Sequence, residues 1–337
     1  MKNVISYFYN MNVEHIKINN NVYYFFSNGN NFVFQEVNDE FIDEEMLVNL
    51  SKSFINSSFG SFQVVNNKYN NVVTIYNDKK YVLLHDGILH DEHVDFNDIL
   101  SVNIVPFFEV NDFQIKWNAL WKDKIDYFEL YVRNNYLKYS NVAIYFDYFL
   151  GLAENAVSYL EDTIKDGRIE NVDKKVICHK RITTISTMRE LYNPLNFVVD
   201  HPVRDVALYL KLLFFQDRII DIDFDEILSK VNLSVYGARL LFSRMLFPSF
   251  FFDAFEKIND GNVSSEVIIK LVDKMSDYES FLEEVWSKLN ERYSIPRIMW
   301  IKKVDYSSTF TTPNTSGISF TSIDSMPSFN VTSIMLQ

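Results

Sequence analysis

Two short apolar segments, each of which ends in polar residues, restrict the possible folds of this chain more than any other sequence feature. The first is Val176-Ile177-Cys178-His179, which runs into Lys180-Arg181. The second is Phe197-Val198-Val199, which runs into Asp200-His201-Pro202. Short apolar runs bounded by polar residues are typical of buried β-strands. Because helical periodicity lies on both sides, we expect two short strands within a largely helical region.

Composition places the chain among globular proteins. It has 337 residues, of which 47% are hydrophobic and 23% are charged. That length suits one large domain or two ordinary ones. The 30 Phe and 20 Tyr residues can supply much buried area, since each aromatic side chain buries roughly 150–250 Å².

Charge and cysteine content exclude several classes of protein. The net charge of −13 argues against nucleic acid and against an anionic membrane surface as partners. Cys178 is the single cysteine, so we expect no internal disulfide and a reducing compartment. Residues 1–6 lack the apolar core of a signal peptide, and no apolar run is long enough for a transmembrane helix.

Residues 1–85 are predicted to form a β-rich lobe. Strands are expected over residues 13–18, 22–26, 32–37, 61–65, 71–76 and 80–85. Asn28-Gly29 predicts a tight hairpin turn, and Asn77-Asp78 a second turn. Asp43-Glu44-Glu45 opens a helix that reaches about Asn56, because acids suit the first turn. The expected order is βββαβββ.

A connector over residues 86–112 leads to a helical lobe at 113–302, and the fold class is α+β. Residues 95–102 suit either a short helix or a strand. The helix over 141–163 is apolar nearly all round, so we expect it to be buried. Residues 303–337, rich in Ser and Thr, are predicted to be a disordered tail. The other helices are expected at 117–136, 204–216, 222–230, 233–246, 250–259, 264–275 and 278–293.

This layout resembles the protein-kinase-like fold, in the branch of aminoglycoside and choline kinases. Residues 148–157, 177–182, 200–207 and 236–242 resemble the YutH type of endospore coat protein, related to the CotS and CotI coat proteins. The resemblance implies synthesis in the cytosol of the mother cell. It also implies assembly into the endospore coat with other spore coat proteins.

Four positions that the resemblance assigns to phosphoryl transfer hold other residues than those the chemistry uses. The loop over the phosphates falls at Asn19-Asn20-Asn21 and has no glycine. The third strand, which should carry a lysine, has Gln35. The catalytic loop reads His179-Lys180-Arg181, and Arg181 at the position of the catalytic Asp cannot accept a proton. The Asn that the resemblance places five residues beyond the catalytic Asp falls near Ser186.

The remaining positions of the kinase-like centre hold the residue types that the resemblance implies. Asp200 matches the metal-binding Asp of the fold and is the candidate ligand for a metal ion. Asp205 matches a structural Asp, which we expect to bind backbone amides at the start of its helix. His179 and His201 are predicted to be structural, because a His at the end of an apolar strand usually satisfies a carbonyl.

Two other groupings have a simpler interpretation than a functional site. His85, His90, Asp91, Glu92 and His93 could bind Zn²⁺ or Ni²⁺, but a polar, solvated linker is the favoured interpretation. Cys178 beside His179 could suggest a nucleophile, but adjacent strand residues point to opposite faces.

These observations lead to three hypotheses. The first is a catalytically degenerate kinase-like protein with a structural or assembly role in the endospore coat and no cofactor. The second is an active phosphotransferase that uses ATP, Mg²⁺ on Asp200 and another acid as base. The third is a metal-binding module built on the connector histidines.

Overall fold

The computed structural model describes residues 1–19, 22–37, 43–89, 94–109, 117–140, 142–182, 187–218, 223–261 and 263–299. The chain divides into two compact units. One contains the described residues of Met1–Phe113 and Lys175–Asp205, and the other those of Gln114–Lys174 and Val206–Gln337.

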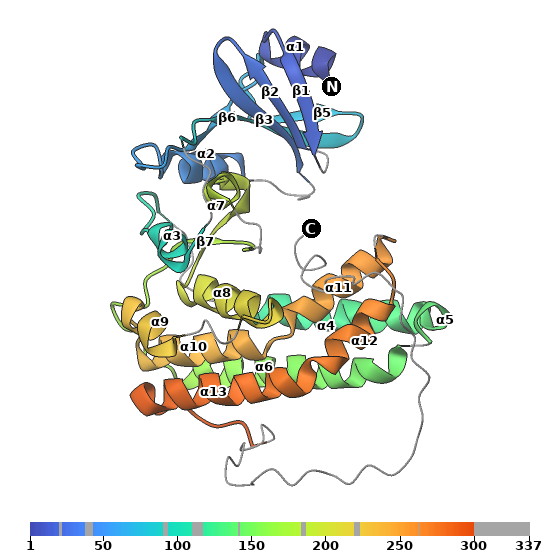
Figure 1. Cartoon of the computed structure of the whole chain (residues 1–337), viewed down its shortest axis with the longest axis vertical. Coiled ribbons are helices and arrows are strands. Elements are labelled where there is room, and N and C mark those ends of the chain that lie inside the picture. The colour runs from blue at the N-terminus through green and yellow to red at the C-terminus, as the bar shows by residue number, and fades with distance from the viewer. Residues whose placement is uncertain are drawn as a thin grey trace. The chain divides into compact units, whose positions relative to one another are not determined.

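The first unit contains a twisted antiparallel sheet (Figure 1). Within the described residues its strand order is β1-β2-β3-β6-β4, and β5 also pairs with β6. Helix α2 (Glu44–Lys52) follows β3, so the predicted order βββαβββ is confirmed. The strands are β1 (Glu14–Asn19), β2 (Val22–Ser27), β3 (Asn30–Val37), β4 (Phe62–Val65), β5 (Val73–Tyr76) and β6 (Lys79–Asp86).

Local residue chemistry explains the turns and the cap in this sheet. Asn28 and Gly29 have φ of 49° and 82°, as a type I′ turn requires. Asn77 and Asp78 have φ of 50° and 60° between β5 and β6. Asp43 caps α2, because its carboxylate accepts a hydrogen bond from Met46 N at 2.9 Å. The predicted turns and helix start are therefore confirmed.

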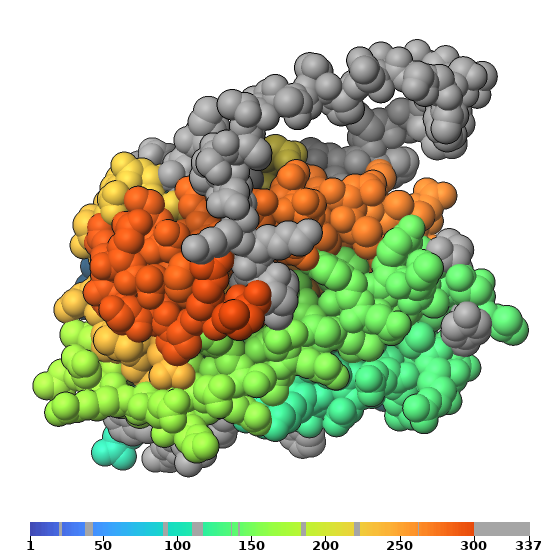
Figure 2. Space-filling view, turned by 90° about the horizontal axis from the view of Figure 1, so that it is seen from below, coloured from blue at the N-terminus to red at the C-terminus, as the bar shows by residue number. Residues whose placement is uncertain are grey.

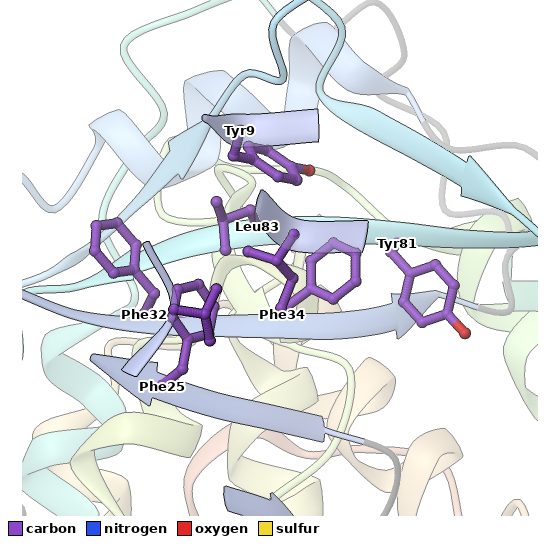
Figure 3. Close-up of a cluster of buried hydrophobic side chains, with 8 residues drawn as sticks. Tyr9, Phe25, Phe32, Phe34, Tyr81 and Leu83 are labelled. Carbon is purple, nitrogen blue, oxygen red and sulfur yellow. The ribbon is translucent and has the colours of Figure 1, made fainter. Parts of the chain in front are cut away.

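Helix α1 (Lys2–Tyr9), which the sequence pattern did not predict, covers one face of this sheet. Ile5 and Tyr9 pack there against a buried aromatic layer (Figure 3). The rings of Phe34 and Tyr81 stack at 4.8 Å, and Tyr9 meets Phe34 edge-on. Burial raises the pKa of Tyr9 to about 12. The other members of the layer are Val13, Phe25, Phe32 and Leu83.

The two segments that open the sequence analysis form an antiparallel pair, β7 (Val176–His179) and β8 (Phe197–Asp200). Ile177 lies opposite Val199, and His179 lies opposite Phe197. Three short helices occur in the same unit: α3 (Phe96–Ser101), α7 (Met188–Leu191) and η2 (Pro194–Asn196). The undecided residues 95–102 thus form a helix, which begins with a capping box at Asp95.

The β7–β8 pair packs in the first unit, although the sequence analysis placed it in the helical lobe. The borders predicted at residues 85 and 112 remain predictions. The predicted tail at 303–337 lies outside the described residues.

The described part of the second unit is helical (Figure 1), and Figure 2 shows one face of its surface. Its helices pack around a core rich in aromatic side chains. Phe128 and Phe251 are fully buried, and their ring centroids lie 5.2 Å apart. Helix α6 packs against α4 and α10. The helices are α4 (Trp117–Asn134), α5 (Tyr136–Tyr139), η1 (Ala143–Tyr145), α6 (Phe146–Asp166), α8 (Val203–Phe215), α9 (Phe224–Lys230), α10 (Val235–Leu246), α11 (Ser249–Asn259), α12 (Glu266–Asp273) and α13 (Met275–Tyr293), and α8 begins in the first unit.

The helix expected over 141–163 to be apolar nearly all round and buried is η1 with α6, and α6 is buried on one side only. Asp147, Glu154 and Ser158 are exposed, and their spacing places them on one face of the helix. Leu152, Ala156 and Leu160 are buried on another face. The helix is therefore amphipathic, because exposed polar residues recur at the helical repeat.

We expect Ile5→Ala to lower the free energy of unfolding by about 2–5 kcal/mol, because it removes a fully buried side chain from the layer under α1. Ile18→Ala is the matched control, since Ile18 is 61% exposed in the same unit. That change should cost less than about 0.5 kcal/mol. Chemical denaturation of the full chain measures both, and equal losses would contradict the assignment of α1 to the core.

Candidate functional site

His179, the last residue of β7, is fully buried and bound at both ring nitrogens. Its Nδ1 lies 2.7 Å from Asp205 Oδ2. Its Nε2 lies 3.1 Å from the carbonyl oxygen of Leu191. A carbonyl can only accept, so Nε2 carries a proton and donates it. Both ring nitrogens are thus engaged within the protein, which favours the structural role predicted for His179.

Asp205 connects the start of α8 to two other segments. Its Oδ1 accepts a hydrogen bond from His179 N at 2.9 Å. Its Oδ2 also accepts from Asn103 Nδ2 at 2.8 Å, and that amide group donates to Ile177 O at 3.1 Å. The sequence analysis expected Asp205 to bind amides of its own helix. Instead, its carboxylate binds an amide at the end of β7, which still favours a structural role.

His201 is buried directly before α8 and stabilises the first turn of that helix. Its Nδ1 accepts a hydrogen bond from Val203 N at 3.3 Å. Its own backbone N–H donates to Asp200 Oδ1 at 2.8 Å. These contacts resemble those of a helix cap and favour the structural role predicted for His201.

Asp200, the candidate metal ligand, is paired with a cation from the next helix. Arg204 Nη1 donates to Asp200 Oδ2 at 3.0 Å. Arg204 Nε also donates to the carbonyl oxygen of His179 at 2.7 Å, and Nη2 to that of Lys180 at 3.4 Å. Sequence reasoning missed Arg204. The available sequence signal for this ion pair was the positive charge of Arg204, which lies four residues after Asp200 at the start of a helix.

Arg181, at the position of the catalytic base, has its backbone held by one side chain. Its N–H donates to Asn196 Oδ1 at 3.0 Å, and its carbonyl accepts from Asn196 Nδ2 at 2.8 Å. The side chain of Arg181 is exposed. Ser186, the expected Asn position, lies outside the described residues.

The strand positions that would hold a nucleotide are engaged in other contacts. Gln35 Oε1 accepts a hydrogen bond from Asn193 Nδ2 at 3.1 Å. Glu44, in the first turn of α2, accepts from Val72 N at 3.1 Å. Of the phosphate-loop residues Asn19-Asn20-Asn21, the structure describes Asn19 alone.

A pocket of about 290 Å³ lies at one end of the sheet in the first unit. His15 enters it from a bulge in β1, where its φ of 44° is unusual for a residue with a Cβ. Arg189 closes one side, where its Nε donates to Asp86 Oδ2 at 2.8 Å. The other lining residues are Lys17, Tyr24, Phe25, Phe26, Asn31 and Phe32. Its volume lies at the lower limit of the roughly 300–1,000 Å³ usual for ligand sites.

Taken together, the residues present do not fit ATP with Mg²⁺. Phosphate binding would need a cation on the third strand, where Gln35 is uncharged and bound to Asn193. A metal ion would need several oxygen ligands, but Asp200 is already paired with Arg204. Among the described residues, no group of three or more His, Cys, Asp or Glu side chains is arranged to hold a metal ion.

The remaining candidates from the sequence form no site among the residues that the structure describes. His90, Asp91, Glu92 and His93 lie outside the described residues. His85 contacts the ring of Phe32 edge-on. Cys178 is fully buried, and its Sγ lies 3.5 Å from the carbonyl oxygen of His201. Because His179 uses both ring nitrogens elsewhere, the two residues do not form a nucleophile pair.

We expect Asp205→Asn to lower the free energy of unfolding by about 3–5 kcal/mol, because it removes one partner of a fully buried pair. Asp217→Asn is the matched control, since that carboxylate is 81% exposed in its ion pair with Lys274. The control should change stability by less than about 1 kcal/mol. Chemical denaturation of both variants tests this, and a small loss for Asp205→Asn would contradict a structural role.

Comparison with known proteins places the chain in a family. The family described as "Spore coat putative kinase YutH" matches residues 2–285. The endospore coat-associated protein YutH of Bacillus subtilis (strain 168) is 30% identical over 212 residues. That alignment covers 56% of this chain and 62% of the relative. The chain therefore matches less than two thirds of the length of the relative.

Solved structures show the same fold at low sequence identity. An aminoglycoside phosphotransferase from Alicyclobacillus acidocaldarius is 10% identical, with a TM-score of 0.58 over 86% of this chain and 97% of its own. A microcompartment-associated aminopropanol kinase is 11% identical, with a TM-score of 0.54 over 86% of this chain and 98% of its own.

No helix among the described residues is long and apolar enough to cross a membrane.

The kinase-like arrangement predicted from the sequence is thus confirmed, and so is the resemblance to coat proteins. The chain belongs to the YutH family of spore coat proteins and has the kinase-like fold of aminoglycoside phosphotransferases.

Proposed function

We propose that this protein is a catalytically degenerate kinase-like protein with a structural or assembly role in the endospore coat. Arg181 at the position of the catalytic base carries this proposal. Phosphoryl transfer to a hydroxyl uses an acceptor for the proton of that hydroxyl. A guanidinium has five donors and no acceptor, so Arg181 cannot serve.

The contacts around Arg181 support the same conclusion. Asn196 binds both the N–H and the carbonyl of Arg181, which fixes the backbone of this loop. His179 directs both ring nitrogens to Asp205 and Leu191, so it does not replace the missing base. The polar groups of this centre therefore stabilise the fold and are not directed toward a substrate.

Membership of the family and the name of its relative support the assignment to the coat. The relative is described as endospore coat-associated. We infer synthesis in the cytosol of the mother cell and contacts with other coat proteins. Nucleic acid is a poor partner for a chain with a net charge of −13, because phosphate groups repel it.

An active phosphotransferase is the alternative, and the retention of Asp200 at the end of β8 favours it. Such an enzyme would use ATP and place Mg²⁺ on Asp200. Arg204 would first have to leave that carboxylate, and another acid would have to act as base. The degenerate protein, by contrast, requires no cofactor.

We expect ATP with Mg²⁺ to leave the thermal unfolding midpoint of the full chain unchanged. A ligand that binds only the native state, at 100 times its Kd, would stabilise it by about 2.7 kcal/mol. Differential scanning fluorimetry with ATP and Mg²⁺ together, and with each alone, measures this. A stabilisation by the pair that disappears in Asp200→Asn would contradict the proposal and support the alternative.

We expect a fluorescent fusion of this protein to assemble on the spore surface in sporulating Bacillus subtilis that lacks its own YutH. Arg181→Ala should assemble equally well, because the proposal gives the guanidinium no catalytic role. Asp205→Asn is the control for loss of the folded protein. Diffuse fluorescence of the unaltered fusion in the mother cell would refute the coat assignment.

A further inference from the structure

Three oxygen atoms converge on one guanidinium beside the β7–β8 pair. They are Asp200 Oδ2 at 3.0 Å, the carbonyl oxygen of His179 at 2.7 Å and that of Lys180 at 3.4 Å from nitrogens of Arg204. All of these residues lie within the first unit. One charged side chain therefore links the end of β7, the loop after it and the end of β8.

This group of oxygens requires a cation. The side chain of Asp200 is only 10% exposed, and the side chain of Arg204 is 19% exposed. A buried carboxylate without a counter-charge is strongly destabilising. The two carbonyl oxygens add further negative potential around the same guanidinium.

The same oxygens are of the kind that a hard divalent cation selects. Mg²⁺ and Ca²⁺ prefer carboxylate and backbone carbonyl oxygens. Arginine meets the same requirement differently, because its planar fork donates several hydrogen bonds in fixed directions and keeps its charge. Arg204 uses its Nε and both terminal nitrogens in this way.

We propose that Arg204 is the resident cation of this centre and occupies the place of a divalent metal ion, so that the protein is independent of metal. This inference rests on the proposed function, in which Asp200 has no role in binding Mg²⁺. It goes further because it assigns the oxygens of Asp200, His179 and Lys180 to a latent cation site. Neutralising Arg204 should make that site available.

The experiment uses the full chain and metal ions alone. Wild type, Arg204→Gln and Arg204→Ala are unfolded thermally in Mg²⁺ or Ca²⁺, with NaCl at equal ionic strength as reference. The midpoint of the wild type should not change with either metal. Both variants should unfold at lower temperature and recover about 2–4 °C with millimolar Ca²⁺ or Mg²⁺.

Two further variants separate a specific site from a general effect of charge. Arg204→Gln combined with Asp200→Asn lacks the carboxylate and should lose the recovery by metal. Arg292→Gln is the matched control, because Arg292 pairs with Asp225, whose side chain is 63% exposed. That variant should show no response to metal.

Two outcomes would overturn the inference. One is a folded Arg204→Gln variant that does not respond to either metal. The other is a wild type that Mg²⁺ or Ca²⁺ stabilises through Asp200. Arg204→Gln keeps an amide donor for the carbonyl oxygens, so it serves if Arg204→Ala does not fold. Nucleotide is absent throughout, so failure here is distinct from failure of the proposed function.

Discussion

The buried contact between His179 and Asp205 is the interaction on which the centre of the first unit depends. Asp205 begins α8, His179 ends β7, and Asn103 brings the segment after α3 to the same carboxylate. Leu191 adds α7 through its carbonyl oxygen. Because a buried polar group is costly without a partner, these hydrogen bonds favour one arrangement of the four segments, although Asn103 Oδ1 itself has no hydrogen-bond partner among the described residues. That arrangement sets where the ends of both strands lie.

The same scaffold holds the kinase-like centre together by contacts that need no catalytic role. The contacts of His179, His201 and Asp205 stabilise the fold whether or not a substrate is bound. The adjacent positions are then open to change, and here they hold Arg181 and Arg204. Arg204 supplies the positive charge that the buried Asp200 needs. The charge of Asp200 is therefore balanced within the chain itself.

Predictions from the sequence succeeded where local chemistry decides the structure. The Asn28-Gly29 turn and the Asp43 cap depend on residues next to each other in the chain. Helix α1 was missed because eight residues give little periodicity and its stability comes from the sheet beneath it. The one-sided burial of α6 was misjudged because the first three turns carry few polar residues, and Asp162 and Lys165 extend the exposed face only near the end of the helix.

The sequence by itself determined the strands, most helices, the kinase-like order and the arginine at position 181, which the resemblance aligns with the catalytic Asp. These follow from residue type, turn chemistry and periodicity, which act over a few residues. Only the tertiary structure decided which groups meet at the centre. Asn103, Leu191 and Asn196 are unremarkable in sequence, yet each binds a key residue from a separate segment. Arg204 lies four residues from Asp200, but its bonds to His179 and Lys180 exist only because β7 pairs with β8. Such contacts depend on how distant segments pack, and no local pattern encodes that.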